Sequence, residues 1–211
     1  MTNFIPIFPL GIVVYPGEQL NLHIFEPRYK QLVTECISEN KPFGIPAVID
    51  KKVNEYGTLV EISRVEKVYG TGELDIRTKG LKVFRILEII REVPEKLYAG
   101  AIVNYPDNQE RSNARLQKQV LGAVRELHQL LQVSKSFPQA DDVLRAYDLA
   151  HHAGLSLKEE YEVLHLFQEM QRLEYLKRHL LKVIPVMTEM ERLKDRVKLN
   201  GHFRNLSVDN F

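Results

Sequence analysis

The chain has 211 residues, of which 44% are hydrophobic and 27% are charged, and its formal net charge is +1. This length allows one large domain or two small subdomains with a buried core. The near-neutral charge excludes the overall basic excess of many nucleic-acid-binding domains. The single cysteine excludes an intramolecular disulfide and a zinc cluster built from cysteines.

The amino terminus lacks the basic segment and the following apolar run of a signal peptide. No uninterrupted apolar stretch has the length needed to cross a bilayer. We therefore expect a cytoplasmic protein that does not use a membrane as a partner.

The first 25 residues predict an interrupted strand, a turn and a second strand. Pro6 and Pro9 break the first apolar run, and proline cannot donate to a sheet, so this run is expected at an edge. Pro16-Gly17 fits the two central positions of a type II turn. Residues 19–25 then alternate between apolar and polar side chains, as a half-buried strand does.

A helix is predicted to begin at Pro27, because proline suits the first helical turn. The residues that follow at helical spacing form one apolar stripe: Tyr29, Leu32, Val33, Cys36 and Ile37. Since Cys36 lies on this stripe, we expect a buried structural thiol.

Residues 43–105 are predicted to be rich in short strands. Polar or glycine-containing turns are expected at 51–55, at Gly70-Thr71-Gly72 and at Lys79-Gly80. Many short strands with turns between them favour a small barrel or a sandwich. The expected strands are 43–49, 58–62, 73–78, 81–90 and 97–105.

The period of the apolar residues becomes helical after a polar linker at 107–113. One helix is expected from Ala114, a second is expected to begin at Asp141, and Ser156 to Glu159 forms a capping box for a third. The remaining period fits one long helix kinked at Pro185, or two helices. Asn200-Gly201 is the expected end. The predicted divisions are a β-rich subdomain (1–106), a helical subdomain (107–200) and a tail (201–211).

Five segments resemble the LON substrate-binding domain, the amino-terminal domain of ATP-dependent Lon proteases. They are Pro6 to Gly17, Leu22 to Tyr29, Pro42 to Ile45, Gly57 to Ile62 and Thr78 to Ile86. The resemblance implies an α+β fold, with an N-terminal PUA-like β pseudobarrel, one helix packed against it and a C-terminal helical bundle. It also implies a role in recognising polypeptide substrates.

No pattern in the chain predicts catalysis, a metal site or a cofactor. Lon proteases carry a Walker A loop and a Ser-Lys dyad, and these 211 residues contain no G-x-x-x-x-G-K-[ST] segment. A peptidase S16 family relationship is therefore expected without its chemistry. His151 and His152 are adjacent, so they face different sides of a helix. His165 and Glu169 are expected to form a pair on one helix face.

The segment around Phe25-Glu26 is the candidate binding site. In one interpretation, Glu26 and Arg28 are polar groups at a helix start, while Phe25 and Tyr29 are core residues. In the other interpretation, this surface belongs to a peptide-binding groove, which would be formed by His23, Phe25, Glu26, Arg28 and Tyr29.

Three functions remain in competition. The first is a stand-alone LON-domain protein that binds an unfolded polypeptide or a partner protein, such as a member of a protease or chaperone system. The second is an RNA-binding PUA-like module, which the near-neutral charge disfavours, because phosphate contacts need clustered Lys or Arg. The third is an enzyme of unrecognised type.

Overall fold

The computed structural model describes residues 3–137 and 139–205. The chain divides into two compact units. The first unit contains the chain up to Arg111 together with Leu155–Arg172, and the second contains Ser112–Gly154 and the chain from Leu173 onward. The expected boundary at residue 106 did not anticipate this interleaving.

Residues 155–172 belong with the first unit because they form hydrogen bonds to one strand of that unit and to the segment between its first two strands. The hydroxyl of Tyr15 donates to the carbonyl of Glu160 at 2.9 Å. The hydroxyl of Tyr161 accepts a hydrogen bond from the backbone amide of Tyr56 at 3.0 Å. Local sequence patterns do not predict hydrogen bonds between residues so far apart in the chain.

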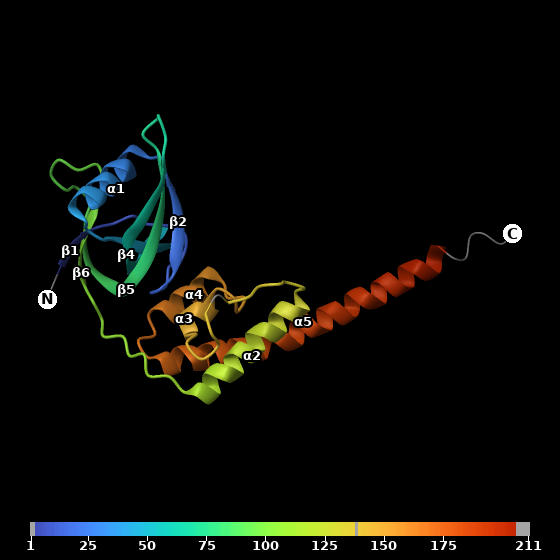
Figure 1. Cartoon of the computed structure of the whole chain (residues 1–211). Helices are drawn as coiled ribbons and strands as arrows, with labels where there is room; N and C mark the ends of the chain where they lie inside the picture. The colour runs from blue at the N-terminus through green and yellow to red at the C-terminus, as the bar shows by residue number, and fades with distance from the viewer. Residues whose placement is uncertain (1–2, 138, 206–211) are drawn as a thin grey trace. The chain divides into compact units, whose positions relative to one another are not determined.

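The first unit is built on a six-stranded antiparallel sheet (Figure 1). Its strands are β1 (Asn3–Pro6), β2 (Gln19–Ile24), β3 (Phe43–Ile49), β4 (Lys52–Val68), β5 (Leu74–Ile90) and β6 (Gly100–Asn104). The order along the sheet is β1-β6-β5-β4-β3, and β2 pairs with β5 outside this path. The edge position predicted for the first strand is confirmed.

The segment after β1 closes the sheet onto β3. Ile7 and Gly44 form a parallel bridge, and so do Leu10 and Ala47. The amide of Phe8 donates to the carbonyl of Gly44 at 2.8 Å. The two ends of the strand order are thereby joined, which confirms the expected α+β fold with a β pseudobarrel.

Helix α1 (Pro27–Glu39) packs against this pseudobarrel, as expected. Pro27 occupies its first turn, and Asn40 ends it in the left-handed conformation with φ of 51°. Its buried residues are Tyr29, Leu32, Val33 and Cys36, which confirms most of the predicted stripe. Ile37 differs, because 42% of it is exposed to solvent.

Two of the expected turns are wrong. The turn between β3 and β4 is formed by Asp50 and Lys51, both with positive φ, so most of the expected polar turn at 51–55 is strand. Gly80 does not separate strands but lies inside β5. A side chain there would collide with the carbonyl oxygen of Tyr15, so glycine allows a close approach of two backbones. The turn at Gly70-Thr71-Gly72 is confirmed.

The described helices after the sheet are α2 (Ala114–Leu130), α3 (Ala146–Ala150), α4 (Leu157–Leu164) and α5 (Glu169–Asn205). The capping box at Ser156 and Glu159 is confirmed. The second helix begins at Ala146, so the prediction that Asp141 starts it is wrong. Asp141 instead binds the guanidinium of Arg125 at 2.7 Å.

Helix α5 is continuous through Pro185. It ends at Asn205, so the expected end at Asn200-Gly201 is wrong, and the rest of the predicted tail (206–211) lies outside the described residues. Among the described residues, no helix combines the length and apolar content that a membrane crossing requires.

The second unit has its own apolar interior. On α2, Val120, Val124 and Leu127 are at most 1% exposed. The side-chain amide of Gln117 donates to the backbone carbonyls of Asp141 and Leu144. This buried amide holds the segment before α3 against α2. The segment is therefore held by Gln117, and Asp141 does not cap a helix there.

Candidate functional site

His23 lies on the outer face of β2, opposite Asp75 of β5. Its Nδ1 is 2.7 Å from the carboxylate of Asp75, and its Nε2 is 3.6 Å from that of Glu73. The hydroxyl of Tyr69 donates to Asp75 at 2.6 Å. The hydrogen bond from Tyr69, followed by that from His23, lowers the pKa of Asp75. These groups form a partnered, solvent-exposed cluster.

Phe25 contradicts the interpretation that placed it in the core, because 58% of it is exposed. Its ring stacks on His23 with a centroid distance of 6.0 Å. The ring of Tyr69 meets His23 edge-on at 5.8 Å. The structure therefore brings His23 and Phe25 together with Tyr69, which the sequence did not single out.

The other three predicted site residues have different environments. Tyr29 is only 7% exposed, and its ring stacks on Phe8 at 3.8 Å, so it is a core residue. Glu26 and Arg28 form an ion pair of 2.8 Å, and the guanidinium of Arg28 lies 4.5 Å from the centroid of the Tyr29 ring. They lie at the start of α1, where the scaffold interpretation placed them, and the side chain of the N-cap residue Glu26 makes no capping hydrogen bond.

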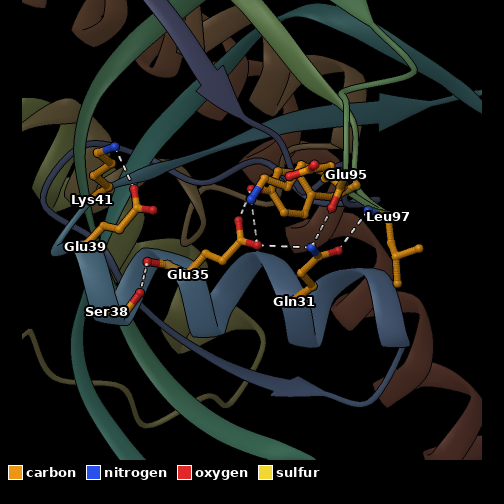
Figure 2. Close-up of polar contacts among 9 residues, drawn as sticks. Gln31, Glu35, Ser38, Glu39, Lys41, Glu95 and Leu97 are labelled. Atoms are coloured by element: carbon orange, nitrogen blue, oxygen red, sulfur yellow. Dashed lines mark hydrogen bonds and ion pairs between the residues drawn. The ribbon is translucent and has the colours of Figure 1, made fainter.

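A polar network anchors the outer face of α1 to the chain between β5 and β6 (Figure 2). The carboxylate of Glu35 accepts hydrogen bonds from the Tyr98 hydroxyl, from Lys96 at 2.9 Å and from Gln31 at 3.0 Å. Gln31 also donates to the carbonyl of Glu95 and accepts from the amide of Leu97. Local sequence patterns do not reveal this network, because the partners of Gln31 and Glu35 between β5 and β6 are more than 60 residues away along the chain.

The network shifts the acidity of its members. Burial alone would raise the pKa of Glu35, but the hydrogen bonds from Tyr98, Lys96 and Gln31 outweigh burial and lower it. Burial, followed by the bond to Glu35, raises the pKa of Tyr98. Burial also raises the pKa of the Cys36 thiol to about 12. This thiol is protonated at neutral pH, which agrees with its predicted structural role.

The outer part of β4 has a strand neighbour on one side only. Pairing between β4 and β3 extends from Lys52 to Val60, whereas pairing between β4 and β5 continues to Val68. The segment Glu61–Val68 therefore presents an edge, and its residues are exposed except for the half-buried Ile62. Two register shifts, after Ile62 and after Val65, interrupt its pairing with β5.

A groove of about 320 Å³ lies beside this edge. One wall comes from the end of α1 and the residues after it, and the other wall comes from β4 and β5. Its lining includes Ile37, Lys41, Ile62, Arg64, Val65 and Leu81. We call this feature the edge groove.

The histidines and carboxylates do not assemble into a metal site within the part of the chain that the structure describes, where no three such side chains are grouped. The predicted pair of His165 and Glu169 is wrong, because His165 ends α4 and Glu169 begins α5. Glu169 instead binds Arg172 at 2.9 Å, with both side chains 1% exposed.

These features belong to a known class of domain. The sequence model of the ATP-dependent protease La (LON) substrate-binding domain matches residues 5–182. This match spans most of the chain, and the protein therefore belongs to the LON substrate-binding domain family.

Two solved structures resemble the fold. The Lon N-terminal domain protein from Xanthomonas campestris aligns with a TM-score of 0.63 and 26% identity, over 82% of this chain and 96% of the other. The N-terminal domain of the Lon protease from Mycobacterium avium complex aligns with a TM-score of 0.61 over 84% of this chain and 98% of the other. Its identity of 12% shows the common fold alone.

A curated relative matches a shorter segment. The protein cereblon from Gallus gallus is 30% identical over 90 residues, which is 40% of this chain. The match covers 20% of cereblon, so the chain spans only a small part of that protein.

Proposed function

We propose that this chain is a non-catalytic protein that binds unfolded polypeptide through its first unit. The observation that carries the proposal is the match to a substrate-binding domain over residues 5–182. A folded partner protein from a protease or chaperone system is the second kind of occupant that the same surface would accept.

The surface chemistry of the first unit supports recognition of polypeptide. Phe25 and Val68 each expose more than half of their area, and such side chains bind apolar segments of a client. Basic and acidic groups alternate on the outer strands, as in the pair of Arg77 and Glu66 at 3.1 Å. A mixed surface of this kind favours polypeptide over nucleic acid, which needs a continuous basic track.

Among the predicted site residues, His23 and Phe25 are proposed to contact the client directly. Both are exposed and stand at the end of β2, beside Tyr69. Glu26 and Arg28 are proposed to support that contact by orienting the first turn of α1, and Tyr29 by holding that turn to the core.

A direct binding experiment tests the proposal. The purified chain is titrated into fluorescently labelled lactalbumin that has been reduced and carboxymethylated, so that it stays unfolded, and anisotropy is recorded. Native lactalbumin with its disulfides intact serves as the matched control. We expect saturable binding of the unfolded form only. Equal affinity for both forms, or no binding to either, would contradict the proposal.

A second assay addresses the absence of catalysis. The purified chain is incubated with ATP and with unfolded lactalbumin, and release of phosphate and of peptides is followed. We expect neither product above the buffer control. Turnover of either substrate that co-purifies with the chain through two columns would refute a non-catalytic role.

A further inference from the structure

We infer that the client binds as an added β-strand along Glu61–Val68 of β4, with alternate side chains in the edge groove. This inference rests on the proposed function and specifies its site and the conformation of its ligand. The occupant is an extended, unfolded segment that carries apolar residues at alternate positions.

Among the residues that the structure describes, the backbone of Glu61–Val68 has no strand partner on the side opposite to β5. Every second residue of a strand edge points its N–H and C=O groups away from the neighbouring strand. Over Glu61–Val68 these groups face solvent on the side opposite to β5, since β3 pairing stops at Val60. Another extended backbone satisfies such a row of donors and acceptors, and addition of a strand is a recurring mode of peptide recognition.

Apolar side chains line the groove next to that edge. Ile37 is 42% exposed, Val65 is 36% exposed and Leu81 is 38% exposed, and all three line the edge groove. Successive side chains of a strand point to opposite faces. A guest strand on this edge would therefore turn every second side chain toward the groove and leave the others in water.

The basic side chains that line the edge groove are paired with carboxylates. The basic groups in the lining are Lys41 and Arg64, and each is close to a carboxylate: Lys41 lies 2.6 Å from Glu39, and Arg64 lies 3.5 Å from Glu66. The lining itself also contains Glu61. Such compensated charge does not attract a phosphate backbone, but it accommodates a polypeptide of either sign.

The irregular pairing of β4 disfavours pairing of this edge with a second copy of the chain. The register shifts after Ile62 and after Val65 increase the local twist and interrupt the ladder. Bulges and charged side chains are devices that discourage open-ended pairing between like edges. A short and flexible guest strand can follow this twist, whereas a second rigid edge cannot.

The groove is also formed before the client arrives. One wall belongs to α1, and the Glu35 network fixes α1 to the chain at Lys96 and Tyr98. A preformed wall lowers the ordering cost of binding. The edge groove therefore combines a backbone template, apolar contacts and a rigid wall.

Hydrogen exchange of the full 211-residue chain tests this mode of binding. Backbone amide exchange is measured by NMR, with and without saturating reduced and carboxymethylated lactalbumin. We expect the outward-facing amides of Glu61–Val68 to exchange at least about tenfold more slowly in the complex, as new hydrogen bonds form. Saturable binding with no protection in this segment would overturn the edge proposal and leave the proposed function standing.

Two groove variants, Ile37→Asp and Leu81→Asp, complete the test, with Leu87→Asp as the control. Leu87 is an apolar residue of β5 that is 48% exposed and lies outside the groove lining. We expect each groove variant to weaken the affinity about tenfold, and the control to bind as the wild type does, with all three folded by circular dichroism. Equal losses in the three variants would overturn the proposal.

Two further outcomes are informative. If the wild type does not bind unfolded lactalbumin at all, the proposed function and this inference both fall. If protection of Glu61–Val68 rises with protein concentration in the absence of lactalbumin, the edge pairs with a second copy of the chain, and the polypeptide assignment is wrong.

Discussion

The two long strands β4 and β5 behave differently along their length. In their inner part, Thr58, Leu59 and Val60 are at most 4% exposed, and β4 has strand neighbours on both sides. In the outer part, β4 has a neighbour on one side, and Val68 is 66% exposed. One continuous hairpin thus supplies both the closed pseudobarrel and an open edge.

This difference separates stability from recognition. Closing the barrel requires buried apolar contacts, and it requires glycines where two backbone segments approach each other closely. These features are concentrated in the inner part. Recognition requires backbone groups and apolar side chains that remain accessible, and the outer part provides them. Substitutions in the two parts should therefore have distinct consequences.

The largest expected effect is the loss of the Phe84 ring. Phe84 is 0% exposed and packs in the inner part, so Phe84→Ala should lower the free energy of unfolding by about 4 kcal/mol. The matched variant in the outer part is Val68→Ala. This substitution should change the free energy of unfolding by no more than about 0.5 kcal/mol. Urea unfolding followed by circular dichroism measures both. Similar losses for the two variants would erase the contrast between the parts.

A smaller loss is expected from adding one methyl group at Gly57. A Cβ there would come within 2.5 Å of the Pro46 Cα, and the neighbouring backbone must shift. Gly57→Ala should destabilise the protein by about 2 kcal/mol. The control is Gly70→Ala, where nothing lies within 4 Å of the added carbon. A neutral Gly57→Ala in the same unfolding assay would show that the inner part is less tightly closed than we infer.

The next effect concerns the anchor of α1. Glu35→Gln removes a hydrogen-bonded carboxylate and should cost about 1.5 kcal/mol at neutral pH. Because folding lowers the pKa of Glu35, its contribution is fully present above the ordinary value of 4.5 and is lost as pH falls through the lowered value. The gap between wild type and variant should therefore shrink below pH 4.5.

The matched control for this variant is Glu39→Gln on the same helix, which pairs with the exposed Lys41 and should change stability far less. If the wall of the edge groove depends on the anchor, Glu35→Gln should also weaken binding of unfolded lactalbumin. A gap between wild type and Glu35→Gln that widens in acid would show that the sign of the pKa shift is opposite to the one stated.

The smallest effect on stability is expected at His23. Its side chain is 49% exposed, so His23→Ala should leave the unfolding midpoint unchanged. If His23 contacts the client as proposed, the affinity for unfolded lactalbumin should fall about threefold. Asn21→Ala, at another exposed position of β2, is the control. Unchanged affinity in His23→Ala would confine the binding surface to the edge groove.

Local patterns predicted the local elements well. Pro27 starts α1 and Ser156 caps α4, as expected, because each preference concerns neighbouring backbone groups within one helical turn. Prediction failed where a distant partner decides the conformation. Lys79-Gly80 looked like a turn, but contact with Tyr15 keeps it within a continuous strand.

The candidate site was only partly accessible to such reasoning. The alternation in β2 placed His23 on an outer face, and the structure agrees. Phe25 was assigned to the core in one interpretation and to a groove in the other, and only its surroundings revealed an exposed ring stacked on His23. Neither interpretation identified Tyr69 or Glu35, since their partners come from other elements.

The sequence by itself determined the family, the position of α1, the turn at Gly70-Thr71-Gly72 and the apolar faces, because these depend on residue order and short-range sterics. The tertiary structure decided where pairing between β3 and β4 stops, how Ile7 closes the barrel onto Gly44, and which wall Glu35 holds in place. Strand partners are chosen by packing among residues far apart in the chain. The open edge of β4 is therefore a property of the assembled sheet. It cannot be predicted from the sequence of any single segment.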